Sequence, residues 1–107
     1  MPKPLFIPLK REFFDAFARG EKHFEYRTYG PRWNERTCAI GRQVTFSCGY
    51  GKARRMAGEI TSFYTSATPQ LLPGWSACFG DRHHTAAVIG VRVLNAEAIR
   101  PALSDSD

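Results

Sequence analysis

Apolar and polar residues alternate along much of the chain, which is the pattern of strands in a sheet with one buried face. In residues 24–29, for example, the even positions share one face and the odd positions, including Glu25 and Arg27, share the other. The pattern predicts five strands, at residues 5–9, 24–29, 43–48, 54–65 and 86–94. Pro4 and Pro8 place the first strand at a sheet edge or end it early, because proline donates no ladder hydrogen bond.

Residues 10–20 follow a helical pattern instead. Phe13, Phe14 and Phe17 are spaced i, i+1, i+4 and so share one helical face. Gly20 is well placed for a left-handed C-cap, so we expect the helix to end there. Between the later strands we expect a loop or helical turn at residues 32–39, a tight turn at 49–51, and an irregular stretch at 69–80 with one short helix around Trp75.

These elements predict an α+β, mostly β fold with one main helix after the first strand. Closing such a sheet into a barrel would remove its edges. The 107 residues are enough for a single domain, with a core at about residues 5–94 and a frayed tail at 101–107. No apolar run is long enough to cross a membrane and no secretory signal is visible, so we expect a cytoplasmic protein without a membrane partner.

Three cysteines, an odd number with no CxxC spacing, favour reduced thiols over a disulfide framework or a zinc site. The adjacent pair His83 and His84 is a poor metal site, since neighbouring strand residues point to opposite faces; a surface loop is the better interpretation. We also find no dinucleotide, EF-hand, zincin or nucleophile-elbow pattern. No metal and no cofactor are therefore expected.

The charge is unevenly distributed. The chain carries a net charge of +5, with 12 Lys and Arg against 6 acidic residues in residues 1–60, and 3 against 4 in the remainder. A positive field in one half suits a polyanionic partner such as RNA, although a basic surface that only aids solubility would look the same.

Residues 10–36 hold the most informative chemistry. Lys22 follows the predicted end of the helix, and Glu25 shares a strand face with Arg27, so two cations and one carboxylate should meet at the end of a strand. Cations bind phosphate and aromatic faces stack on bases, which makes this segment a candidate RNA site. Its candidate binding residues are Lys10, Lys22, Arg27, Tyr29, Arg32, Trp33 and Arg36. The alternative is a plain Glu25–Arg27 ion pair, with Trp33 closing the barrel end.

A basic, glycine-spaced turn follows the third predicted strand. It lacks the P-loop pattern but could track a phosphate backbone while one ring stacks on a base. This turn adds the candidates Tyr50, Lys52, Arg54 and Arg55. A solvated turn is the alternative. Trp75 either packs over the barrel mouth or lines the cleft.

The same segments resemble the ASCH (activating signal cointegrator homology) family of the PUA-like superfamily. The resemblance covers roughly residues 5–94 and rests on these stretches: Leu9-Lys10, Phe13-Phe14-Asp15-Ala16, Gly20-Glu21-Lys22, Glu25-Tyr26-Arg27, Trp33 and Gly41-Arg42-Gln43-Val44-Thr45-Phe46. It implies a PUA-like mixed β-barrel with a helix-lined cleft. It also implies RNA, or a modified nucleoside or nucleotide, as the ligand.

Some ASCH proteins remove the acetyl group of N4-acetylcytidine, and others have been linked to cleavage of single-stranded RNA. The resemblance places Lys22 at the proposed activating lysine, while Glu25 stands where the amidohydrolases have threonine. Asp81 is the one acid between Glu59 and Glu97, where a further glutamate would be expected. The implied catalytic set is Lys22, Glu25 and Arg27, with Glu25 as base and a cation for the oxyanion.

The sequence leaves three hypotheses. The first is a binding module for RNA or a nucleotide, whose cleft is formed by Lys10, Lys22, Glu25, Arg27, Tyr29 and Trp33 and flanked by Lys52, Arg54 and Arg55. The second is a small hydrolase of modified nucleosides or single-stranded RNA. The third is a regulatory protein that recognises another protein. If Glu25 lies buried beside both cations, its pKa should fall, which favours binding over catalysis. The oligomeric state is left open.

Overall fold

The computed structural model describes residues 3–73, 75–79 and 85–95. The elements run in the order β1 (Leu5–Leu9), α1 (Arg11–Ala18), β2 (Phe24–Thr28), β3 (Gln43–Cys48), β4 (Arg55–Ser66), a 3-10 turn η1 (Pro69–Leu71), α2 (Trp75–Phe79) and β5 (Ala86–Asn95). The five predicted strands, the early helix and the short helix at Trp75 are thus confirmed within one or two residues. Asp81, His83, His84 and the tail at 101–107 lie outside the described residues.

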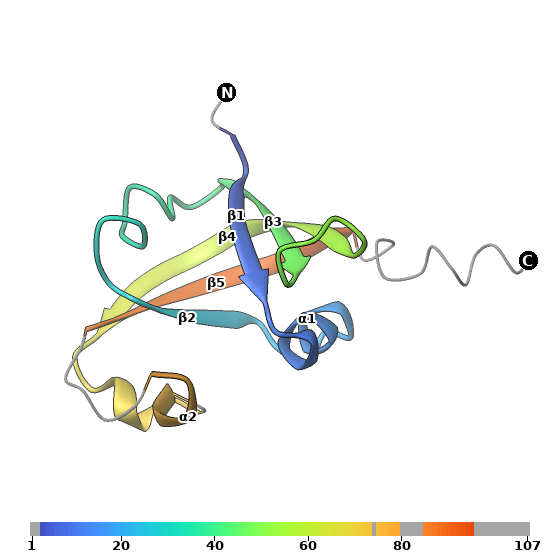
Figure 1. The fold of residues 1–107 in the computed structure, drawn as a ribbon. Coiled ribbons are helices and arrows are strands. Elements are labelled where there is room, and N and C mark those ends of the chain that lie inside the picture. Colours follow the sequence, from blue (N-terminus) through green and yellow to red (C-terminus); the bar gives the residue numbers. More distant parts are fainter. Residues whose placement is uncertain (1–2, 74, 80–84, 96–107) are drawn as a thin grey trace, which may run out of the picture.

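The strands form one mixed sheet in the order β1-β3-β4-β5-β2, and the sheet curls into a half-barrel (Figure 1). β1 runs parallel to β3, while the other neighbours are antiparallel. Register shifts in the β4–β5 ladder, at Ala57/Gly58 and Ile60/Ser62, help the long strands bend. The predicted mostly β, PUA-like α+β fold is confirmed. The hydrogen-bonded ladder, however, ends at β1 and β2 in the described part of the chain, so the backbone leaves two edges.

The interior is filled from both sides of β5. Its odd residues Ala87, Ile89 and Val91 belong to the main core, whereas Ala86 and Val88 pack with Trp75 in a second, smaller cluster. This alternation is what a strand with both faces buried produces. The main core also receives α1, whose Phe14 and Phe17 are buried, and the Phe17 and Phe46 rings lie 4.4 Å apart. The small cluster attaches α2 to the sheet and so positions it near β2.

The end of α1 fixes where the next segment starts. Gly20 adopts a left-handed conformation with φ of 79°, as its predicted role as a C-cap requires. The backbone N–H groups of Glu21 and Lys22 both donate to the Ala16 carbonyl, at 2.9 and 3.2 Å. Lys22 is therefore held against the last turn of α1, just before β2 begins. No helix in the described residues is long and apolar enough to cross a membrane.

Candidate ligand-binding cavity

A cavity of about 270 Å³ lies where the end of β1, the start of α1, β2 and the α2 segment meet. Its volume is just below the usual range for small-molecule pockets, about 300–1,000 Å³, so it suits one compact ring system rather than a folded polymer. The lining residues are Pro8, Leu9, Lys10, Phe13, Lys22, Glu25, Tyr26, Arg27, Pro73, Trp75, Cys78 and Phe79.

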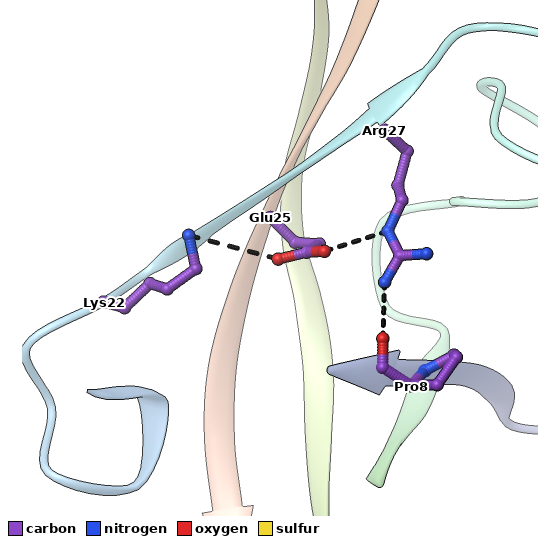
Figure 2. A network of polar contacts seen from close by, with 4 residues as sticks. All are labelled: Pro8, Lys22, Glu25 and Arg27. Carbon is purple, nitrogen blue, oxygen red and sulfur yellow. Dashed lines mark hydrogen bonds and ion pairs between the residues drawn. The ribbon is translucent and has the colours of Figure 1, made fainter. Parts of the chain in front are cut away.

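Four of the lining residues, Pro8, Lys22, Glu25 and Arg27, form a polar network, which Figure 2 shows. The Lys22 Nζ lies 4.0 Å from Glu25 Oε1, and the Arg27 Nε donates to Glu25 Oε2 at 2.9 Å. The Arg27 Nη2 donates in turn to the Pro8 carbonyl, at 2.7 Å. Because Pro8 is in β1 and Arg27 in β2, one side chain links the two edges that the backbone ladder leaves open. The predicted meeting of two cations around a carboxylate is confirmed as geometry.

Lys22 sits among aromatic rings. Its Nζ lies 5.2 Å from the Phe13 ring centroid, 5.5 Å from Phe17 and 5.0 Å from Tyr26. Cation–π contacts of this kind replace part of the water that a charged ammonium loses on burial. The Lys22 side chain keeps 19% of its surface exposed, so the amine is shielded but can still be reached from the cavity.

Burial shifts the pKa values of Glu25 and Lys22 in opposite directions. Loss of water raises the pKa of Glu25, and the charges of Arg27 and Lys22 only partly oppose this change. Loss of water likewise lowers the pKa of Lys22, against the attraction of Glu25. The expected fall in the pKa of Glu25 is therefore wrong. The ion pairs are present as predicted, but a carboxylate that is only 7% exposed is penalised more by burial than it gains from its partners.

Much of the remaining cavity wall is aromatic. Tyr26, Trp75 and Phe79 line it together with Phe13, and the Trp75 and Phe79 rings lie 4.2 Å apart. Trp75 is 1% exposed, and its indole Nε1 has no hydrogen-bond partner among the described residues. Trp75 packs against β5 in the small cluster and also borders the cavity, so each interpretation of Trp75 holds in part. Pro8, Leu9, Phe13, Tyr26, Pro73, Cys78 and Phe79 were not among the predicted site residues, and they come from segments distant in sequence.

Other predicted site residues lie outside the cavity lining. Lys10 lines the cavity, whereas Tyr29 and Trp33 are not among its lining residues. Trp33 is buried in the main core and stacks on Arg27, with the guanidinium carbon 4.7 Å from the ring centroid. Trp33 thus helps to hold the Arg27 guanidinium in place. Tyr29 donates a short hydrogen bond to Glu35 on the surface. Arg32 and Arg36 are exposed, and the Arg32 guanidinium carbon lies 5.4 Å from the Trp33 ring centroid.

The basic segment that follows β3 and ends at the first residue of β4 forms a separate surface, which we call the basic turn and define as Tyr50, Lys52 and Arg55. Tyr50 is 82% exposed and Lys52 is exposed, while the Arg55 guanidinium lies over the Phe6 ring. The Gly49 N–H donates to the Leu9 carbonyl at 2.8 Å, which holds this turn beside the end of β1 and hence near the cavity.

The neighbouring Arg54 is not free for a ligand in the same way. Its Nη2 pairs with Asp15 Oδ1 at 2.7 Å, and its guanidinium lies over the Phe14 ring. Arg54 therefore joins the β3–β4 connection to α1. Within the described ranges, no group of three or more His, Cys, Asp or Glu side chains is arranged to hold a metal ion. Cys38, Cys48 and Cys78 are free thiols.

No protein-family model matches the sequence, and no curated protein matches it significantly. Solved structures do match the fold. The chain superposes on a tyrosine variant of ZmASCH from Zymomonas mobilis with a TM-score of 0.65 and 14% identity, covering 97% of this chain and 84% of that one. It superposes on the hypothetical protein PH0355 with a TM-score of 0.64 and 14% identity, covering 86% of this chain and 100% of that one. The chain therefore has the fold of an ASCH domain, as its resemblance to that family implied.

Proposed function

We propose that this chain is an ASCH-family protein that binds single-stranded RNA, or a nucleoside derived from it, by taking one base into the cavity. The observation that carries the proposal is the Lys22–Glu25–Arg27 network in a small cavity with aromatic walls. Unpaired bases are bound in proteins by stacking on aromatic faces and by hydrogen bonds to their edges. The three free thiols agree with a cytoplasmic location, where such RNA occurs.

The charge arrangement favours a base over a phosphate inside the cavity. Glu25 lies between the two cations, so a phosphate placed there would meet a carboxylate at close range. The phosphates find better sites outside, along Lys10 at the rim and the basic turn beside it. On this proposal the cavity holds the base, while the exposed cations hold the strand and make binding depend on salt.

Fluorescence anisotropy with a labelled, short single-stranded RNA tests the proposal. We expect binding that weakens steeply as salt rises, and a loss of about tenfold or more in affinity on Lys22→Met, which keeps the apolar stem inside its cage of rings. Arg92→Met is the matched control, since Arg92 is an exposed cation that does not line the cavity and should leave affinity nearly unchanged. Equal affinity for wild type and Lys22→Met, or binding that ignores salt, would contradict the proposal.

A second function, hydrolysis at the same site, is favoured by the two opposed pKa shifts. A raised pKa makes Glu25 a stronger base near neutral pH, and a lowered pKa leaves Lys22 less firmly protonated. Glu25 would take a proton from water as the water oxygen attacks the amide carbon, and Lys22 or Arg27 would stabilise the resulting oxyanion. The intermediate would then collapse with cleavage of the C–N bond, and Glu25 would return the proton to the leaving amine nitrogen. Incubation with N4-acetylcytidine and with labelled RNA tests this. The hydrolase hypothesis would be contradicted if no turnover is seen, or if turnover is unchanged in the Glu25→Gln variant.

A further inference from the structure

The polar groups of the cavity stand in a fixed order: donor, acceptor, donor. At one end is the Lys22 ammonium, which has donors only. In the middle is Glu25, and at the other end is the Arg27 guanidinium, again with donors only. All three lie in a row in Figure 2. The core holds the middle group in place, because Glu25 is only 7% exposed and Arg27 is supported by Trp33.

Each of the three groups keeps unused hydrogen-bonding capacity. Within the described part of the chain, Glu25 Oε2 accepts from Arg27, whereas Oε1 has only the Lys22 ammonium at 4.0 Å. Arg27 has five N–H donors, and its described hydrogen bonds use Nε and one hydrogen of Nη2. The Lys22 Nζ contacts rings and one distant oxygen. Polar groups that are largely removed from water and keep spare hydrogen-bonding capacity favour a ligand that supplies the missing partners.

The complementary ligand edge is acceptor, donor, acceptor. Among the RNA bases, only uracil presents this order, through the O4 carbonyl, the N3–H and the O2 carbonyl. Cytosine presents donor, acceptor, acceptor, which sets its N3 lone pair against a carboxylate. Guanine presents acceptor, donor, donor, which sets its amino group against the Arg27 cation. Adenine lacks the third group. Each of these bases leaves at least one pair of like groups facing each other.

We propose that the cavity selects uracil, with the N3–H donated to Glu25 Oε1 and the two carbonyl oxygens accepting from Lys22 and Arg27. This inference rests on the proposed function and specifies its ligand. The ring would lie against the aromatic side chains of the cavity, where the partly exposed Tyr26 and Phe79 offer stacking surfaces and the buried Trp75 packs against Phe79. The carboxylate makes the selection, because a site that hydrogen-bonds a particular N–H rejects analogues that lack it.

Three matched oligonucleotides test the inference. Each is a short single-stranded RNA of adenosines with one central residue: uridine, N3-methyluridine or cytidine. For the wild-type protein, we expect the uridine strand to bind at least about tenfold more tightly than the other two. N3-methyluridine is the sharpest comparison, since it keeps both carbonyl oxygens and the ring but loses the one hydrogen that Glu25 would accept.

Two variants test whether the preference for uridine comes from the Lys22–Glu25–Arg27 network. Glu25→Gln keeps the shape of the side chain and should reduce the preference for uridine over cytidine to a few-fold, whereas Arg92→Met should leave it unchanged. Thermal unfolding shows whether each variant is folded. If Glu25→Gln fails to fold, the methylated strand decides on the wild-type protein alone. Equal binding of the uridine and N3-methyluridine strands, or tighter binding of the cytidine strand, overturns the uracil inference.

The two proposals fail in different ways. If all three strands bind alike and Lys22→Met weakens all of them, the cavity binds bases without selecting uracil, and the proposed function survives alone. If none of the three strands binds, both proposals are wrong.

Discussion

The cavity network and the basic turn are built from the same kinds of residues but sit in opposite surroundings. Each places cations beside aromatic rings: Lys22 among Phe13, Phe17 and Tyr26, and Arg55 over Phe6. The Lys22 side chain, however, is 19% exposed and forms an ion pair with the buried Glu25 carboxylate, whereas Tyr50 of the basic turn is 82% exposed. Burial, not residue type, separates the two regions. Charged groups that are partly buried keep fixed positions relative to one another. Charged groups exposed to solvent contribute only a screened electrostatic attraction.

The geometry of the cavity comes from the way the half-barrel is closed. The backbone ladder ends at β1 and β2, and the Arg27 side chain spans between them by donating to Pro8. Trp33 on one side and Glu25 on the other fix the guanidinium. The basic turn joins no such pair of edges. It lies beside β1, where the neighbouring Gly49 N–H donates to the Leu9 carbonyl at 2.8 Å and Arg55 lies over the Phe6 ring. A change in the network should therefore affect both folding and binding, and a change in the turn should affect binding only.

The largest effect is expected from Glu25→Ala. Removing the side chain leaves the Arg27 Nε without its 2.9 Å acceptor and opens a gap between Arg27 and Lys22, and losing one partner of a buried hydrogen bond typically costs about 1–3 kcal/mol. We expect the free energy of unfolding in urea to fall by roughly this amount, and RNA binding to be lost. Glu21→Ala is the control, because Glu21 pairs with Arg19 on the exposed surface and should leave the unfolding midpoint unchanged. Equal unfolding midpoints for the two variants would contradict the prediction that the buried network stabilises the fold more than exposed charges do.

The sequence predicted the network better than its surroundings. Strand periodicity put Glu25 and Arg27 on one face, and the Phe13, Phe14 and Phe17 spacing with Gly20 put Lys22 beside them; these are local patterns. The cavity walls depend instead on non-local packing. No periodicity shows that Trp75 and Phe79 come to lie against β2, or that Trp33 turns inward behind Arg27.

The direction of the pKa shift at Glu25 was missed for the same reason. The sequence shows its two cationic neighbours but not how completely the carboxylate is removed from water. Predicting that shift requires the packing of α1, β1 and α2 around the network, which only the fold supplies.

An intermediate effect is expected from pH. Because the folded state raises the pKa of Glu25 above its ordinary value of 4.5, the folded protein binds the proton more tightly than the unfolded chain does. The stabilisation from this group is therefore present at low pH and is lost as pH rises from about 4.5 through the higher folded-state pKa. Urea unfolding across this range should show Glu25→Gln gaining stability relative to wild type as pH rises. A constant difference would mean that the carboxylate is not destabilised by burial.

The smallest effect on folding is expected from the double change Lys52→Ala and Arg55→Ala in the basic turn. Lys52 is exposed and Arg55 is partly exposed. Among the described residues, the Arg55 side chain contacts the Phe6 ring and donates a 3.3 Å hydrogen bond to the Gly51 carbonyl, so the free energy of unfolding should change by no more than about 0.5 kcal/mol. If the turn holds the RNA backbone, each lost phosphate contact should reduce the slope of log affinity against log salt by about 0.7. Anisotropy titrations over a series of salt concentrations measure this slope. The uridine preference should be unchanged, because the turn supplies a field while the buried network orders the hydrogen bonds. If the base preference changes while the slope does not, the basic turn contacts the base and does not bind the phosphates, which contradicts the prediction.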